Sequence, residues 1–466
     1  MLELHDKYDL IIIGSGFAGL AAAIEAAEAG AEVMVLEKMK APGGNSVISD
    51  GGIAAPGTDE QVKAGIADSA QLMYEDMIRA GEGLNYPELV KIVTEQAKET
   101  YLWSKEYLGV SYLDRVDLFG GHSVPRCHTT ASVSGRDIVK KQLARLKDLK
   151  VPVLTGIYVK NFITGPDGRL DKVTIHSGYN YQKGATGPEE VLSAARSLIV
   201  ASGGFGSDIA FRKAQDPRLD QAIASTNKLF ATAEIIKECL ALGANPVQLS
   251  RIQLFPFASP DEKGFGAGPM FGDYVVLPYG LIIDPKTAAR FVNELGNRKE
   301  VAEALLNIGR PALSLTDQKG VINAGWDITR ALKKGVVKTF SSLEHLADYY
   351  EINAQKLKQT VSRYNTMLGQ RQDDDFQKPL LKEAAPITSP PFYAMRMWPK
   401  VHYTMGGIQI DSSARVIDAN QKPIPGLFAA GEVTGGIHGA CRLGSCAITE
   451  SLVMGRIAGI KAVSTA

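Results

Sequence analysis

The segment YDLIIIGSGFAGLAAAIEAAEAGAEVMVLEK, residues 8–38, constrains the fold more than any other part of the sequence. Its apolar run DLIII is typical of a buried parallel strand, the alanine-rich stretch ending at Gly30 is typical of a helix, and EVMVLE is typical of a second strand. Between the first strand and the helix, Gly14, Gly16 and Gly19 form G-x-G-x-x-G, which permits a tight turn, close approach of a pyrophosphate and close helix packing. The segment therefore predicts an α/β, Rossmann-like unit that holds a dinucleotide at a helix N-terminus.

The residues around this unit favour FAD over the other dinucleotides. Glu37 ends the second strand and can accept hydrogen bonds from a ribose, which favours FAD or NAD over NADP. A second glycine-rich loop, APGGNSVISDGGIAA at 41–55, is not needed for NAD and resembles the loop that passes over the flavin in FAD proteins. SLIVASGGFG at 197–206 and GLFAAGEVTGG at 426–436 each run from an apolar strand into small residues, where a cofactor can lie against the backbone.

The composition excludes several other classes of protein. The chain has 466 residues, enough for two or three domains, and its 51 basic residues balance its 51 acidic ones. We therefore expect no nucleic-acid partner, and without an apolar run of about 18 residues we expect no membrane insertion. Four cysteines make no disulfide framework, and no metal site is predicted. The start MLELHDKYDLIIIG lacks a signal-peptide pattern, so we expect a cytoplasmic protein, although a mature periplasmic chain would look the same.

These segments, with VHYTMGGIQID at 401–411 and PIPGLFAAGEVTGGIHGACRLGSCAITESLVMGRIAG at 423–459, resemble the flavoproteins of the fumarate reductase and succinate dehydrogenase superfamily. The closest likeness is to the soluble fumarate reductases of flavocytochromes c. The resemblance implies an α/β fold with a discontinuous, Rossmann-like FAD-binding domain at 1–247 and 403–466. It also implies an inserted α+β capping (clamp) domain at 248–402.

The resemblance implies how FAD is held. In membrane-bound members a histidine bonds covalently to the flavin, and Asn45 stands at that position here, so noncovalent FAD is expected. The expected FAD contacts also include Glu432 and the GSCAI segment at 444–448. In full, the residues expected to contact FAD are Gly14, Gly16, Phe17, Ala18, Gly19, Glu37, Lys38, Gly43, Gly44, Asn45, Ser46, Gly51, Gly52, Val159, Ala201, Ser202, Gly203, His402, Gly431, Glu432, Arg442, Ser445, Ala447 and Ile448.

The resemblance also implies the catalytic residues. In RFVNELGNR, Arg298 matches the arginine that protonates the substrate carbon opposite the one receiving hydride from flavin N5. Spacing alone instead favours an ion pair between Arg298 and Glu294 on one helix. Arg442, which is expected in the substrate site together with Gly444, matches the arginine that clamps a substrate carboxylate, which suits its planar fork. His402 and Tyr403 match two adjacent histidines, and Tyr403 can donate one hydrogen bond without bringing positive charge.

Two departures from the family pattern change the expected substrate. Phe255 stands where fumarate reductases have a histidine that helps to bind the second carboxylate. Tyr274 and Leu277 stand where an Arg–Glu pair supplies protons, so we expect another route through Asp273, Tyr274 or Tyr279 and water. Losing charged hydrogen bonds worth about 1.5–3 kcal/mol each disfavours fumarate, and an apolar tail gains from the same change. The sequence therefore favours a 2-enoate with one carboxylate.

Other functions stay open from the sequence. The chain has no C-x-x-C-H and no cysteine cluster for an iron–sulfur centre, so electrons must come from an external donor such as a cytochrome, flavoprotein or other reductase subunit. The alternatives are fumarate reduction itself, a dehydrogenase running in the oxidative direction on a ketosteroid or tricarboxylate, and an FAD protein without catalysis. A less favoured alternative is a thiol–disulfide oxidoreductase that uses Cys441 and Cys446.

Overall fold

The glycine-rich N-terminal segment forms the centre of an eight-stranded sheet in the computed structural model of the chain, which describes residues 7–184 and 187–464. Residues 1–6, on which the expectation of no signal peptide rests, lie outside the described residues. The central strands run parallel, as buried apolar strands predict. In order the sheet contains β18 (Arg415–Ile417), β19 (Pro423–Ala429), β8 (Glu189–Val200), β1 (Lys7–Ile13), β2 (Val33–Glu37) and β5 (Val153–Thr155), with β6 (Tyr158–Thr164) and β7 (Leu170–His176) attached beside β8.

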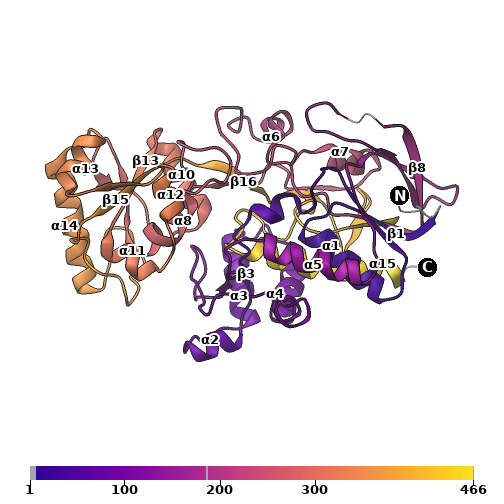
Figure 1. The fold of residues 1–466 in the computed structure, drawn as a ribbon, viewed down its shortest axis with the longest axis horizontal. Coiled ribbons are helices and arrows are strands. Elements are labelled where there is room, and N and C mark those ends of the chain that lie inside the picture. The colour runs from indigo at the N-terminus through magenta and orange to yellow at the C-terminus, as the bar shows by residue number, and fades with distance from the viewer. Residues whose placement is uncertain (1–6, 185–186, 465–466) are drawn as a thin grey trace.

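Helix α1 (Phe17–Glu28) follows β1 and packs against α15 (Cys446–Ser464), the last helix of the chain, and against α5 (Arg136–Asp148) (Figure 1). The contact with α15 is close because Gly455 and Gly459 face the backbone of α1. A Cβ at Gly455 would lie 2.4 Å from the Ala18 carbonyl oxygen. The two ends of the chain thus build one layer, which confirms the predicted Rossmann-like α/β unit.

The segment between β9 (Pro246–Val247) and β17 (Gly407–Ile408) forms a second lobe, at the left of Figure 1, which we call the cap. Its core is a five-stranded antiparallel sheet of β12 (Ala289–Arg290), β11 (Leu281–Asp284), β13 (Ala312–Asp317), β15 (Phe392–Met397) and β14 (Lys338–Phe340). A separate antiparallel pair, β10 (Ile252–Phe255) and β16 (Lys400–Thr404), connects the cap to the larger lobe. The limits predicted for the domains, 1–247, 248–402 and 403–466, remain a prediction.

The remaining elements surround these sheets. The larger lobe adds α2 (Asp59–Lys63), α3 (Ala70–Ala80), α4 (Pro87–Leu102), α6 (Ile209–Gln215), α7 (Glu234–Ala241) and the strand pairs β3 (Ile53–Ala54) with β4 (Cys127–His128) and β9 (Pro246–Val247) with β17 (Gly407–Ile408). The cap helices are α8 (Pro269–Phe271), α9 (Leu277–Tyr279), α10 (Arg298–Ile308), α11 (Gln318–Ala324), α12 (Thr329–Lys333), α13 (Leu343–Tyr349) and α14 (Ala354–Gln370). Among the described residues, no helix is long and apolar enough to cross a bilayer.

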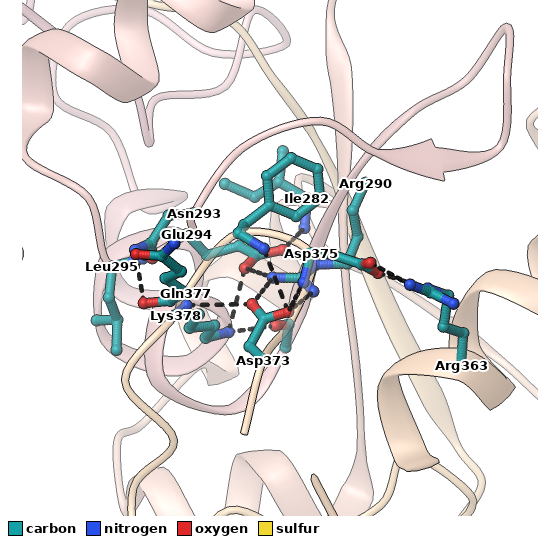
Figure 2. Close-up of polar contacts among 12 residues, drawn as sticks. Ile282, Arg290, Asn293, Glu294, Leu295, Arg363, Asp373, Asp375, Gln377 and Lys378 are labelled. Atoms are coloured by element: carbon teal, nitrogen blue, oxygen red, sulfur yellow. Dashed lines mark hydrogen bonds and ion pairs between the residues drawn. The ribbon is translucent and has the colours of Figure 1, made fainter. Parts of the chain in front are cut away.

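A buried charge cluster fixes the segment that leads into α10 (Figure 2). Arg290 donates to Glu294 at 2.7 Å and to both carboxylate oxygens of Asp373 at 2.9 and 2.7 Å. Lys378 lies 3.5 Å from Glu294 and is fully buried beside it. Glu294 already forms ion pairs with Arg290 and Lys378. The ion pair between Glu294 and Arg298 that spacing favoured therefore does not form. Arg298, the first residue of α10, is directed elsewhere.

Candidate active site

One cavity extends from the glycine loop after β1 to the inner side of the cap, with walls from both lobes. The cap contributes Phe255, Phe265, Asp273 and Arg298, and the last part of the chain contributes Arg442. Most of the residues predicted to hold FAD line this cavity: Gly14, Gly16, Phe17, Ala18, Glu37, Lys38, Gly44, Asn45, Ser46, Val159, Ala201, Ser202, Gly203, His402, Gly431, Glu432, Ser445, Ala447 and Ile448.

Five predicted glycines do not line the cavity, namely Gly19, Gly43, Gly51, Gly52 and Gly444. Their role in the fold is close packing around it. A Cβ at Gly19 would lie 2.0 Å from the Gly14 carbonyl oxygen, and one at Gly444 would lie 2.8 Å from the Phe119 side chain. A side chain at these positions would therefore clash with the walls of the cavity, and their contact with FAD or substrate remains a prediction.

The N-terminus of α1 fits the pyrophosphate of FAD. Its N-cap residue, Gly16, has extended backbone and no side chain that caps the helix, and the first turn holds no acidic residue. The Phe17 N–H donates to Ser46 Oγ at 3.0 Å, and the positive end of the helix dipole faces the cavity, which Gly16, Phe17 and Ser46 line. Glu37 lines the same region and accepts hydrogen bonds from the backbone N–H groups of Ser15 at 3.2 Å and Met39 at 2.8 Å, which holds the glycine loop against the end of β2.

We expect Gly14→Ala to destabilise the chain and to weaken FAD binding. Gly14 has φ +108°, and a Cβ there would lie 2.2 Å from the Ala201 carbonyl oxygen, so both strain and a backbone clash oppose the substitution. The expected loss is at least about 2 kcal/mol, measured by denaturant unfolding together with flavin content. Gly30→Ala is the matched control because Gly30 has φ +86° with nothing within 4 Å of the added Cβ. Equal losses in the two variants would contradict the clash.

Arg442 is a buried cation without a carboxylate partner among the described residues. Its side chain is 5% exposed, its Nη1 donates to the Leu443 carbonyl oxygen at 3.1 Å, and its Nε has no partner. The guanidinium lies 4.9 Å from the centre of the Tyr403 ring, and its backbone N–H donates to Gln253 at 2.7 Å. Burial, and then the charge of Arg298, lower the pKa of Arg442 to about 10. A desolvated, unpaired guanidinium facing a cavity favours an anionic ligand.

Arg298 faces the same cavity from the cap. Its Nη2 donates to Asp273 Oδ2 at 3.1 Å, and its guanidinium lies 4.9 Å from the centre of the Phe255 ring. Asp273 stands on a single π-helical turn, Gly272–Val276, a distortion that is frequent at functional sites. Burial raises the pKa of Asp273 to about 6, against the lowering effect of Arg298 and with a further increase from Asp50. This carboxyl group can therefore change its charge near neutral pH.

His402 and Tyr403 are both uncharged at neutral pH. His402 Nδ1 lies 2.7 Å from Thr226 Oγ1, and burial, followed by the charges of Arg442 and Arg298, lowers the pKa of His402 well below its usual value. Burial first, and then Glu450 and Glu432, raise the pKa of Tyr403 well above the ordinary value for a phenol. Tyr403 therefore presents an aromatic face to Arg442, while its neutral hydroxyl interacts with Glu450.

Aromatic rings fill the part of the cap near Arg298. The ring of Phe255 lies 5.5 Å from Phe257, 5.6 Å from Phe265 and 4.8 Å from His402, measured between ring centres. Phe255 was expected here from the sequence, whereas Phe265, Thr226 and Gln253 were missed. A glycine-flanked phenylalanine and two polar residues of ordinary loops and strands give no sequence signal, and folding alone brings them to the site.

The four cysteines are all free and buried. Burial raises the pKa of Cys441, and it raises the pKa of Cys446 to about 12. Because a thiolate is the reactive form, this environment disfavours the thiol–disulfide chemistry that the C-x4-C spacing left open.

Comparison with known proteins agrees with this geometry. A family described as an FAD binding domain matches residues 9–448. The acrylate reductase flavoprotein subunit of Shewanella woodyi is 39% identical over 463 residues, covering 97% of this chain and 90% of that protein. The fumarate reductase (cytochrome) of Shewanella frigidimarina is 34% identical, covering 98% and 77%. Among solved structures, the open conformation of a flavocytochrome c3 fumarate reductase has a TM-score of 0.77 at 28% identity, covering 99% of this chain and 79% of that one.

The fold and the cavity therefore define a flavin-dependent oxidoreductase that acts on CH–CH bonds, with FAD as its cofactor. The chain belongs to the FAD binding domain family, among the fumarate reductase-like flavoproteins. This confirms the family, the fold class and the cofactor that the sequence predicted.

Proposed function

We propose that the chain reduces the C=C bond of a 2-enoate that carries one carboxylate. The observation that carries this proposal is the buried Arg442, which has no anionic partner within residues 7–184 and 187–464 and faces the same cavity as Arg298. An anion held by Arg442 would bring a conjugated C=C bond into the space that Arg298 also reaches. This fits the name of the acrylate reductase relative.

The residues named above would hold FAD noncovalently in the cavity, and the reduced cofactor would supply the hydride for one alkene carbon. Arg442 binds the carboxylate and draws electron density toward it, which activates the double bond. Arg298 donates a proton to the other carbon, so hydride and proton together saturate the bond and leave Arg298 neutral until it is protonated again. Neutral His402 and Tyr403 add no charge that would compete with Arg442 for the carboxylate.

The part of the cavity lined by Phe255 and Phe265 is unsuited to a second carboxylate. Phe255 and Phe265 offer no hydrogen-bond donors, and the carboxyl groups of Asp50 and Asp273 line the same cavity. A dianion would lose charged hydrogen bonds worth about 1.5–3 kcal/mol each and would meet groups of its own sign. This supports a monocarboxylate over fumarate, and the carboxylate site on Arg442 favours both over a ketosteroid.

Asp273 is the group that we propose returns a proton to Arg298. It contacts Arg298 directly, and Asp50, which accepts a hydrogen bond from Tyr274, lies close enough to raise its pKa. Tyr279, the third residue considered from the sequence, directs its carbonyl to Thr316 and has no recorded contact with Arg298 in the described chain.

We expect Asp273→Asn to slow repeated turnover more than the first turnover, since Arg298 begins protonated. The loss at pH 6 is expected to be about 10²-fold. In the wild type the carrier is protonated below its pKa of about 6, so the steady-state rate falls as pH rises through that value, and Asp273→Asn lacks this limb. The measurement is a pH series with a chemical reductant. Asp284→Asn, a buried aspartate beside Arg310 and outside the cavity, is the control. An unchanged pH limb in Asp273→Asn would contradict the role.

The proposal includes a separate electron donor, such as a cytochrome, a flavoprotein or another reductase subunit, because the chain has no haem-binding motif. It is tested anaerobically by reducing the bound flavin with dithionite and following its reoxidation by acrylate, methacrylate, fumarate, urocanate and a ketosteroid. Fast reoxidation by a monocarboxylic enoate and slow reoxidation by fumarate support the proposal. Fast reoxidation by fumarate or by the ketosteroid alone would replace it with fumarate reduction or with steroid chemistry.

A further inference from the structure

We infer that Phe265 sets substrate specificity by covering the tail of the bound enoate and restricting it to a short apolar group. This inference rests on the proposed function and identifies the substrate class more narrowly. Phe265 is partly buried and lines the cavity together with Arg298 and His402. It belongs to the loop between β10 and α8, which no sequence motif singled out.

The loop is built to hold one ring at the cavity. Phe265 stands between Gly264 and Gly266, whose φ angles of +63° and +79° favour glycine. A Cβ at Gly266 would lie 2.0 Å from the carboxyl carbon of Glu262. Glu262 itself accepts hydrogen bonds from the backbone N–H groups of Ala267 and Gly268, both at 2.7 Å. The Glu262 side chain therefore closes the turn through hydrogen bonds to its own backbone, and Phe265 is the residue of this turn that lines the cavity.

A buried lysine fixes this loop to the strand that carries His402. Lys400 is 2% exposed, and its Nζ donates to the carbonyl oxygens of Glu262 at 2.6 Å and Gly264 at 3.0 Å. Lys400 is two residues before His402 on β16, so the hydrogen bonds of Lys400 hold the turn beside this part of the strand. This places the Phe265 turn over His402, and the ring centres of the two residues lie 6.1 Å apart.

The rings of Phe265, Phe255 and His402 leave no space between them for an aryl tail. Phe265 lies 5.6 Å from Phe255, and Phe255 lies 4.8 Å from His402, distances at which aromatic rings are already in contact. A planar tail would have to displace Phe265 to enter between them, whereas a hydrogen or methyl group would not. The expected substrates are therefore acrylate and its methyl derivatives, and cinnamate is expected to be poor.

The test removes the ring of Phe265 by substitution and then offers cinnamate, a substrate that carries a ring of its own. In Phe265→Ala we expect the ratio of kcat/KM for cinnamate to that for acrylate to rise at least tenfold, because the phenyl group of cinnamate fills the space of the lost side chain. Binding measured by calorimetry must agree: 3-phenylpropanoate should bind Phe265→Ala at least tenfold more tightly than it binds the wild type, and propanoate should not. Phe265→Leu should give a smaller change, and Lys400→Met, which frees the loop, a change in the same direction.

Phe376→Ala is the matched control, since Phe376 is a half-buried phenylalanine of the cap that packs on Arg290 and does not line the cavity. Its substrate ratio should stay at the wild-type value. A wild-type preference for cinnamate, or an unchanged ratio and unchanged 3-phenylpropanoate affinity in a folded Phe265→Ala, overturns the inference while enoate reduction itself stands. Failure of every enoate to reoxidise the wild-type flavin would instead remove the proposed function.

Discussion

Replacing Arg298 with glutamine is expected to lower the rate of enoate reduction by about 10²- to 10⁴-fold, the usual contribution of a positioned general acid. Glutamine keeps much of the length of the side chain but cannot supply the proton. The loss should fall on kcat, with little change in KM, because Arg442 and not Arg298 binds the carboxylate in this account. Single-turnover reoxidation of the reduced flavin at saturating acrylate measures it directly.

Flavin content and absorbance should be unchanged in Arg298→Gln, which separates a catalytic loss from a folding defect. Arg330→Gln is the matched control, because Arg330 is an exposed arginine of the cap on α12. It should reduce acrylate at the wild-type rate. A loss of less than about fivefold in Arg298→Gln would mean that another group protonates the substrate, since a general acid contributes far more than this.

Replacing Arg442 with glutamine is expected to have opposite effects on function and on stability. Loss of two charged hydrogen bonds to the carboxylate, at about 1.5–3 kcal/mol each, should lower kcat/KM for acrylate by about 10²- to 10⁴-fold. In the absence of substrate the same change should stabilise the protein by about 1 kcal/mol or more, because it removes a buried cation that no carboxylate of the described chain pairs with.

These effects are measured by steady-state kinetics and by denaturant unfolding without substrate. Propanoate is a useful probe: it should raise the unfolding temperature of the wild type and leave that of Arg442→Gln unchanged. A variant that loses stability and still responds to propanoate would show that Arg442 is structural and that the carboxylate binds elsewhere.

The part of the fold that could be predicted from sequence is the part set by local pattern. The residues from β1 to Glu37 form strand, turn, helix and strand as expected, since apolar runs and obligatory glycines are local signals. The helix begins at Phe17, earlier than its alanine-rich stretch indicated, because Gly16 already serves as its N-cap. The meeting of Arg298 and Arg442 at one cavity followed only from the family resemblance, as residues so far apart in the chain carry no pairing signal.

The features that could not be predicted from the sequence depend on residues far apart in the chain that compete for the same partner. Spacing favoured Glu294 as the partner of Arg298, yet Asp373 and Lys378, distant in sequence, hold Arg290 and Glu294 in a separate cluster. Arg298 therefore pairs with Asp273 instead. In the same way the turn that carries Phe265 is held by Lys400, which lies on a strand far away in the sequence.

A comparison of fumarate with its monoamide, fumaramate, as oxidants of the dithionite-reduced enzyme tests directly whether the protein binds one substrate carboxylate or two. The two molecules have nearly the same shape and an activated double bond, and they differ by one negative charge. With one carboxylate site at Arg442 and carboxyl groups lining the far end, fumaramate should react at least about tenfold faster at limiting concentration, a difference of about 1.4 kcal/mol. Equal rates, or faster reaction with fumarate, would contradict the account, because the chain would then hold a second carboxylate as firmly as the first.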